Sequence, residues 1–125
     1  MHKPSITLYG IPNCDTVKKA RLWLSSRGQE YRFHDFKREG VPAQQLDLWL
    51  DALGWETVVN RKGTMWRKLD DAAKAAVVDK ASARALLLTQ ASIIKRPVMD
   101  WGGAGKGHLT VGFNDADWAA RRQGG

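Results

Sequence analysis

The chain has 125 residues, of which 43% are hydrophobic and 26% are charged, and it contains one cysteine. This length suits one folded domain, and a single cysteine excludes a disulfide within the chain. The net charge is +7, from 20 lysines and arginines against 13 aspartates and glutamates. The basic residues are scattered and form no nucleic-acid-binding motif, which argues against nucleic acid as the binding partner. Anionic small molecules and acidic proteins remain as candidate partners.

No stretch approaches the roughly 20 consecutive apolar residues of a membrane span. The first four residues lack the apolar segment of a signal peptide. We therefore expect a cytoplasmic protein that has no membrane partner, and we expect a monomer.

The cysteine lies between two predicted elements. The apolar run 6–9 predicts a strand, and Gly10 and Pro12 predict a turn after it. The apolar spacing after Cys14 predicts a helix that ends near Gly28. A thiol at the start of a helix faces unpaired backbone N–H groups and the positive end of the helix dipole, which favour the nucleophilic thiolate. Alternatively, Cys14 is a small buried hydrophobic residue, as many free cysteines are. Its position in the sequence supports both roles equally.

The next stretch predicts a strand and then several helices. Residues 30–36 alternate polar and aromatic side chains, which completes a β-α-β unit with parallel strands. Residues 42–54 have the apolar spacing of a helix that begins at Pro42. Further helices are predicted at 64–69, 70–78 and 80–90.

The C-terminal third begins with the apolar stretch 93–99, in which Pro97 excludes a simple helix. The glycine-rich segment 102–107 predicts a hairpin loop between two strands, and it lacks the spacing of a phosphate-binding loop. Asn114 is expected to cap a last helix. The strands and helix predicted here are 98–101, 108–112 and 115–122.

The element order is β-α-β, a helical insert, then β-β-α, which is the plan of the thioredoxin-like α/β fold. We expect a single domain over residues 1–125. Its thioredoxin-like core would comprise about 5–38 and 92–122, with an all-helical insert at about 42–91, between the second and third strands.

Four short motifs, between about Ile6 and Trp118, carry a family resemblance. They are Tyr9-Gly-Ile-Pro-Asn-Cys14-Asp-Thr, Asn60-Arg-Lys-Gly-Thr-Met-Trp-Arg-Lys-Leu69, Ile93-Ile-Lys-Arg-Pro-Val98 and Val111-Gly-Phe-Asn114. In this order they resemble the arsenate reductase (ArsC)/Spx family, and most of all its YffB-like branch. One such motif is a weak signal, whereas four in the family's order are specific.

The resemblance implies that Cys14 is the catalytic nucleophile, that Arg96 lies beside it, and that Pro97 is the cis-proline next to the thiol. The guanidinium of arginine presents a planar set of donors that suits oxyanions and carboxylates, and its charge favours a neighbouring thiolate. Without the family context, Arg96 reads as a solvated surface residue and Pro97 as an ordinary trans proline.

A single nucleophilic thiol needs a second thiol from outside the chain to release it from a mixed disulfide. Glutathione suits this role as a co-substrate, because it carries carboxylates that Arg96, Arg61 and Lys18 would bind. Thr16 or Asn13 is expected to donate a hydrogen bond to the thiolate, although helix capping explains Thr16 equally well. The substrate would be a small oxyanion or a disulfide, and no bound cofactor is expected.

Two features differ from the family pattern. Arsenate reductases use three arginines around the thiol, but Asn60 stands at the first of these positions, beside Arg61, and residues 108–113 contain no arginine for the third. Spx-type regulators often carry Cys-x-x-Cys, but Val17 occupies the second cysteine position. The residues therefore favour a glutathione-dependent, arsenate reductase-like thiol oxidoreductase that reduces a mixed disulfide better than arsenate.

The alternative is an Spx-like regulatory protein that docks onto RNA polymerase without catalytic turnover. A basic, compact domain with exposed tryptophans would suit such docking. The chain has six tryptophans, of which Trp49 lies on an apolar helix face and is expected in the core.

Overall fold

The computed structural model describes residues 5–102 and 108–124. Within these ranges, four strands form one mixed sheet in the order β2-β1-β3-β4. The strands are β1 (Thr7–Gly10), β2 (Arg32–Asp35), β3 (Val98–Asp100) and β4 (Leu109–Val111). β1 pairs in parallel with β2 and antiparallel with β3, and β3 pairs antiparallel with β4. This sheet confirms the thioredoxin-like α/β fold that the sequence predicts.

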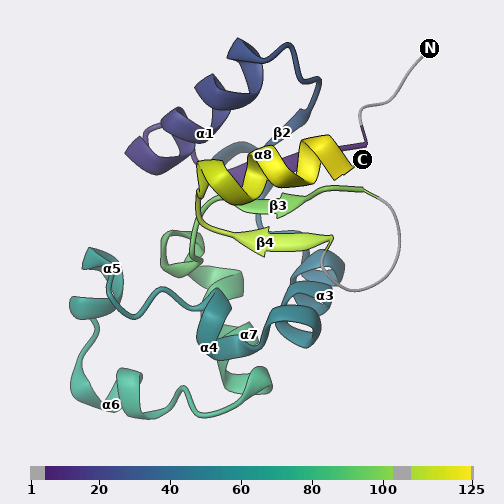
Figure 1. The fold of residues 1–125 in the computed structure, drawn as a ribbon. Helices are drawn as coiled ribbons and strands as arrows, with labels where there is room; N and C mark the ends of the chain where they lie inside the picture. The colour runs from purple at the N-terminus through teal and green to yellow at the C-terminus, as the bar shows by residue number, and fades with distance from the viewer. Residues whose placement is uncertain (1–4, 103–107, 125) are drawn as a thin grey trace.

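Helices lie between the strands and after the last one (Figure 1). α1 (Asp15–Ser26) connects β1 to β2, and α8 (Asp115–Gly124) follows β4. Between β2 and β3 lie α2 (Phe36–Glu39), α3 (Ala43–Leu53), α4 (Trp55–Val58), α5 (Thr64–Arg67), α6 (Asp71–Ala75), α7 (Lys80–Thr89) and the 3₁₀ helix η1 (Ala91–Ile93). The segment between the second and third strands is therefore helical, as predicted. The predicted hairpin loop at 102–107, apart from Gly102, falls outside the described residues.

The two faces of the sheet are covered by different helices. Leu8 and Met99 belong to a buried cluster with side chains of α1 and α8, including Trp23 and Trp118. The alternation of side chains along a strand sends the neighbouring residues to the opposite face, where a second cluster includes side chains of α3, α4 and α7. In Figure 1 the helices α3 to α7 accordingly lie together, apart from α1 and α8.

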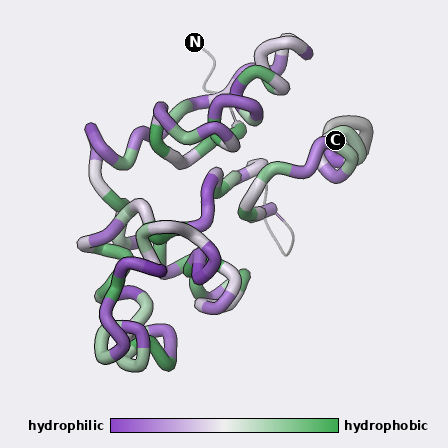
Figure 2. Tube along the Cα trace, turned by 90° about the vertical axis from the view of Figure 1, so that its left-hand side faces the viewer, coloured by the Kyte–Doolittle hydropathy of each residue, from purple (hydrophilic) through white to green (hydrophobic). Residues whose placement is uncertain are grey.

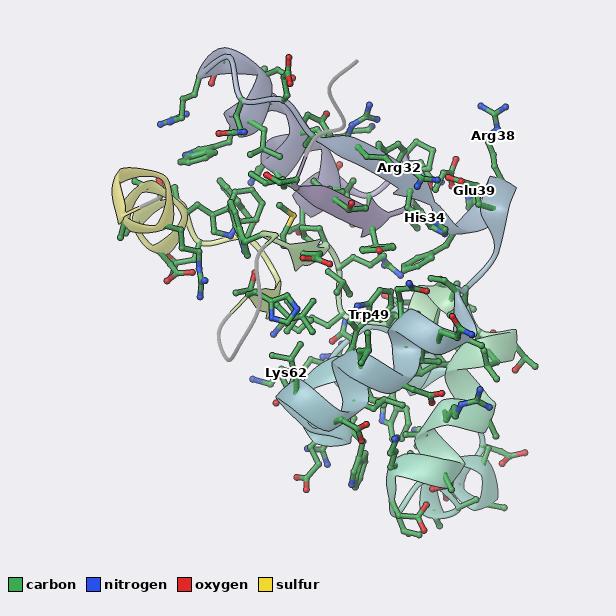
Figure 3. The ribbon with its side chains drawn as sticks, turned by 90° about the vertical axis from the view of Figure 1, so that its right-hand side faces the viewer. Arg32, His34, Arg38, Glu39, Trp49 and Lys62 are labelled. Carbon is green, nitrogen blue, oxygen red and sulfur yellow. The ribbon has the colours of Figure 1, made fainter. Side chains whose placement is uncertain are left out.

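Trp49 joins the helical segment to the sheet, which confirms its predicted place in the core. Its side chain is 1% exposed, and its ring meets that of Tyr9 edge-on with centroids 4.7 Å apart. In Figure 3 it lies between the sheet and the helices below. Burial raises the pKa of the Tyr9 hydroxyl, Asp100 adds to this effect, and Arg32 opposes it.

The second strand spans Arg32–Asp35 and not the predicted 30–36, and it ends at Asp35 because this residue starts a helical turn. Its carboxylate accepts a hydrogen bond from the Lys37 amide at 2.9 Å, so α2 begins at Phe36. Glu39 folds back over this turn and pairs with Arg32 at 3.2 Å, and Figure 3 shows the two side chains together.

A short backbone bridge ties the helical segment to the residues that precede Pro97. The Lys95 amide donates to the Val58 carbonyl and the Asn60 amide donates to the Ile93 carbonyl, both at 2.8 Å. These two bonds flank an isolated antiparallel bridge between Val59 and Ile94. The bridge fixes the turn after α4 beside the residues that lead into β3.

Figure 2 shows short hydrophobic and hydrophilic stretches alternating along the tube. Over the described part of the chain, no helix combines the length and the apolar character that crossing a membrane requires.

Candidate functional site

Cys14 is the N-cap residue of α1, as its position in the sequence suggests. Its backbone is extended, with φ −102° and ψ 126°, and its carbonyl accepts the Lys18 amide at 2.9 Å. The thiol forms no capping hydrogen bond, and the residue is half-buried. Gly10 lets α1 start close to the end of β1, because a Cβ there would lie 2.8 Å from a methyl group of Val17. The thiol is therefore held at a fixed strand-to-helix junction and remains accessible.

A pocket of about 470 Å³ opens beside the thiol, and we call it the thiol pocket. Three separate segments complete it around the start of α1: the turn after α4, the residues before Pro97, and the segment from the end of β4 to the start of α8. Its lining residues are Cys14, Thr16, Asn60, Lys95, Arg96, Val111, Gly112, Phe113 and Asn114. Tertiary structure thus brings Thr16 and Arg96, two of the predicted ligand-binding residues, to the same pocket as the cysteine.

Arg96 lines the thiol pocket from a fixed position. Its Nη1 donates to the Ser92 carbonyl at 2.7 Å and to the Ala91 carbonyl at 3.5 Å, both in η1. Its Nε is buried and has no hydrogen-bond partner within the described residues. The guanidinium therefore keeps donor capacity that the fold does not use.

The peptide bond between Arg96 and Pro97 is cis, which confirms the isomer that the family resemblance implied. Pro97 itself is buried and does not line the thiol pocket. Its carbonyl accepts the amide of Gly112 at 2.9 Å. Gly112 has φ +81°, a conformation that favours glycine, and this bond places the backbone of the pocket wall.

Lys95 is a pocket cation that the sequence analysis did not select. The aliphatic part of its side chain lies beside Gly112, since a Cβ added to that glycine would lie 3.5 Å from the Lys95 Cε. The side chain is exposed, and within the described ranges it forms neither a hydrogen bond nor an ion pair. The sequence signal was its place in the Lys-Arg-Pro triplet, directly before the selected arginine.

The neutral side chains of the pocket are set by local turns. The Asn60 side-chain oxygen accepts the Lys62 amide at 3.3 Å, and the Asn114 side-chain oxygen caps α8 by accepting the Asp117 amide at 2.9 Å. Asn114 therefore has the capping role that the sequence predicts and also faces the pocket. No group of three or more potential metal ligands gathers among the described residues.

Besides Pro97, which was also predicted to contribute to glutathione binding, three predicted ligand-binding residues lie outside the thiol pocket. Arg61 lines a neighbouring pocket, where its Nη2 lies 3.5 Å from a carboxylate oxygen of Glu56. The Asn13 side-chain oxygen accepts a hydrogen bond from the Lys37 ammonium at 3.3 Å. Lys18 is exposed on α1 and lines neither pocket.

The sequence model described as the ArsC family matches residues 9–121. An uncharacterized protein of Haemophilus influenzae is 37% identical over 115 residues, which cover 92% of this chain and 96% of that protein. The global transcriptional regulator Spx of Streptococcus agalactiae serotype V is 25% identical over 112 residues, or 88% of this chain and 77% of Spx.

Solved structures agree with these sequence matches. A YffB protein superposes with a TM-score of 0.84 at 48% identity, over 92% of this chain and 96% of that one. A Brucella melitensis protein described as arsenate reductase (ArsC) related superposes with a TM-score of 0.71 at 46% identity, over 98% of both chains.

Proposed function

The chain belongs to the ArsC family, and from this premise we propose that it is a glutathione-dependent thiol oxidoreductase with Cys14 as its nucleophile. The observation that supports this most is an accessible, uncapped thiol at the start of α1, in a pocket of about 470 Å³ that also contains Arg96 and Lys95. Two cations beside one thiol suit a negatively charged thiol compound such as glutathione.

The proposed reaction has two exchange steps. In the first, the Cys14 thiolate attacks the glutathione sulfur of a mixed disulfide. The bond between Cys14 and glutathione forms, the original disulfide breaks, and the other half leaves as a thiolate that takes up a proton. In the second, the thiolate of another glutathione attacks the bound glutathione sulfur, which gives glutathione disulfide and regenerates the Cys14 thiolate. One mixed disulfide and one glutathione thus give one free thiol and one glutathione disulfide.

The pocket chemistry favours this reaction over arsenate reduction. Holding a tetrahedral oxyanion on the thiol calls for several fixed positive charges around one point. Arg96 is the arginine among the lining residues, Asn60 is neutral, and the wall formed by 111–113 carries no charged side chain. A disulfide needs less, namely an accessible thiolate, room for the tripeptide and a cation for its carboxylates.

Mass spectrometry and steady-state kinetics test the proposal. The purified protein, given a glutathione mixed disulfide without free glutathione, should gain one glutathione on Cys14. With free glutathione it should turn over the mixed disulfide with a higher kcat/KM than arsenate, and Cys14→Ser should abolish both the adduct and the turnover. Efficient arsenate reduction without disulfide turnover would show that arsenate is the substrate, and inactivity in both assays would contradict the enzymatic proposal.

A regulatory role is the second candidate, and the similarity to Spx over 88% of this chain favours it. In this role the protein would dock onto RNA polymerase and the thiol would be dispensable. An internal disulfide switch would be absent, because position 17 is a valine, fully buried against Gly10. Capture of RNA polymerase by both the unmodified protein and Cys14→Ser would support docking, and its absence from both would remove it.

A further inference from the structure

A second pocket adjoins the thiol pocket and shares two of its residues. This side pocket has a volume of about 270 Å³ and lies over the end of α4 and the turn that follows. Its lining residues are Glu56, Thr57, Val59, Asn60, Arg61, Lys62 and Lys95. Because Asn60 and Lys95 line both pockets, a ligand bound at the thiol can extend directly into the side pocket.

The shared wall is fixed by backbone hydrogen bonds. The two 2.8 Å bonds that flank the bridge between Val59 and Ile94 place Asn60 and Lys95 on adjacent segments. The amide of Lys62 donates to the Asn60 side chain, which fixes the start of the turn after α4 relative to the same wall. The side pocket is therefore part of the fold and does not depend on a ligand to assemble it.

The side pocket carries an excess of positive charge. Arg61 pairs with Glu56 at 3.5 Å, so these two charges offset each other. Lys62 and Lys95 have no side-chain hydrogen bond or ion pair within residues 5–102 and 108–124. Figure 3 shows the Lys62 side chain at the edge of the helical part, directed away from the core residue Trp49. Two unpaired ammonium groups therefore remain to attract an anionic group.

We propose that the side pocket is a second subsite, which binds an acidic group on the thiol that leaves in the first exchange step. This inference rests on the proposed function, and it names the substrate class as mixed disulfides between glutathione and an acidic cysteine-containing peptide. When Cys14 attacks the glutathione sulfur, the peptide thiolate departs and takes up a proton, with its acidic side chains beside Lys62 and Lys95. Because exposed ion pairs are individually weak and screened by salt, the expected preference for an acidic peptide is about threefold to tenfold.

Titration calorimetry on Cys14→Ser tests the subsite directly, because this variant cannot cleave the disulfide. The probes are two glutathionylated hexapeptides that differ in having two Glu or two Gln residues beside the cysteine. We expect the Glu peptide to bind about threefold to tenfold more tightly at low salt, and the ratio to approach one at 0.5 M NaCl. Adding Lys62→Gln should lower the ratio. The matched control is Lys68→Gln, which removes the same charge from an exposed residue that lines neither pocket and should keep the ratio.

Three outcomes overturn the subsite: equal affinity for the two peptides, no binding of either one, or the same loss of preference in Lys62→Gln and Lys68→Gln. The proposed function is judged separately, by turnover of a small glutathione mixed disulfide by the protein with Cys14 intact. Turnover without peptide discrimination would remove the subsite alone. Discrimination in binding without turnover would remove the enzymatic proposal and the leaving-group role of the subsite, while its binding of an acidic group would stand.

Discussion

The Arg96 side chain has two roles, one in the stability of the fold and one in the proposed ligand site. Its Nη1 bonds to the Ser92 carbonyl within η1, and the same residue lines the thiol pocket. A substitution should therefore change both the affinity for a ligand and the stability of the fold. The two effects differ in size, since a ligand carboxylate contributes a second charge and the backbone carbonyl does not.

The first prediction is that Arg96→Ala weakens binding of oxidised glutathione to the Cys14→Ser protein about tenfold to 150-fold. This range corresponds to about 1.5–3 kcal/mol for a lost charge-assisted hydrogen bond. The same substitution should lower the free energy of unfolding by roughly 1 kcal/mol through the lost carbonyl contact. Titration calorimetry and urea unfolding measure the two quantities.

Arg96→Lys is the matched control for this prediction. It keeps the positive charge but lacks the planar donor fork, so only part of the affinity should return. Unchanged affinity in the alanine variant would show that Arg96 does not contact the ligand.

At the scale of the element, α7 shows how a helix start is fixed by two side chains. The Asp79 carboxylate accepts from the Ser82 amide at 2.9 Å, and the Ser82 hydroxyl accepts from the Asp79 amide at 3.1 Å. These reciprocal bonds form a capping box at the first residues of the helix. α7 in turn contains Leu87, which is fully buried in the core shared by the sheet and the helices α3 and α4.

The second prediction concerns the pH dependence of this cap. Hydrogen bonds from Ser82 hold the pKa of the Asp79 carboxyl below its ordinary value of 3.8. A carboxyl whose pKa is lower in the fold stabilises the fold above its unfolded pKa, and this contribution is lost as the pH falls through the folded value. Asp79→Ala should therefore lower the Tm at neutral pH and show a smaller further loss on acidification than the unmodified protein.

Asp79→Asn separates the hydrogen bond from the charge. Its side-chain oxygen can still accept from the Ser82 amide, so much of the neutral-pH Tm should remain, but the residue cannot titrate. Thermal unfolding followed by circular dichroism from pH 7 to pH 3 compares the three proteins. An acid profile of the alanine variant that parallels that of the unmodified protein would contradict this account.

On the scale of the whole molecule, the helical segment and the sheet share one of the two cores. The cluster that includes Tyr9 and Val98 of the sheet also includes Leu46, Trp49 and Leu87 of the helices. Each fully buried large side chain contributes about 1.5–3 kcal/mol, so neither part keeps its buried surface without the other. The two parts should therefore unfold together.

The third prediction is that native-state hydrogen exchange gives the same opening free energy for the slowest amides of β1 and α3. Leu46→Ala should lower both values equally, by about 2–5 kcal/mol, because Leu46 is fully buried in the shared core. Leu48→Ala is the control, since Leu48 lies on the same helix but is 57% exposed, and it should change the values by less than about 0.5 kcal/mol. Loss of protection in α3 with β1 unaffected would identify the helical segment as a separate folding unit.

The sequence by itself determined the order of the elements and the chemistry of one residue. Apolar spacing located α1 and α3, alternation located β2, and proline excluded a helix at Pro97, because these signals depend on neighbours in the chain. The same local reasoning placed Cys14 at a helix start, where the structure has it. Motifs in the family's order identified the ArsC family, which the comparisons confirmed. The end of β2 was misjudged by one residue because Asp35 caps the following turn.

Only the tertiary structure decided which charges meet the thiol. Lys95 and Arg96 are adjacent in the sequence, yet both reach the thiol pocket, since Lys95 runs along Gly112 and Arg96 is turned by its bonds to η1. The sequence predicts Arg61 as a further residue that binds the carboxylates of glutathione, but its pairing with Glu56 holds it in the side pocket. These outcomes depend on contacts between residues far apart in the chain, and no periodicity or local spacing encodes which side of a packed segment a long basic side chain will take.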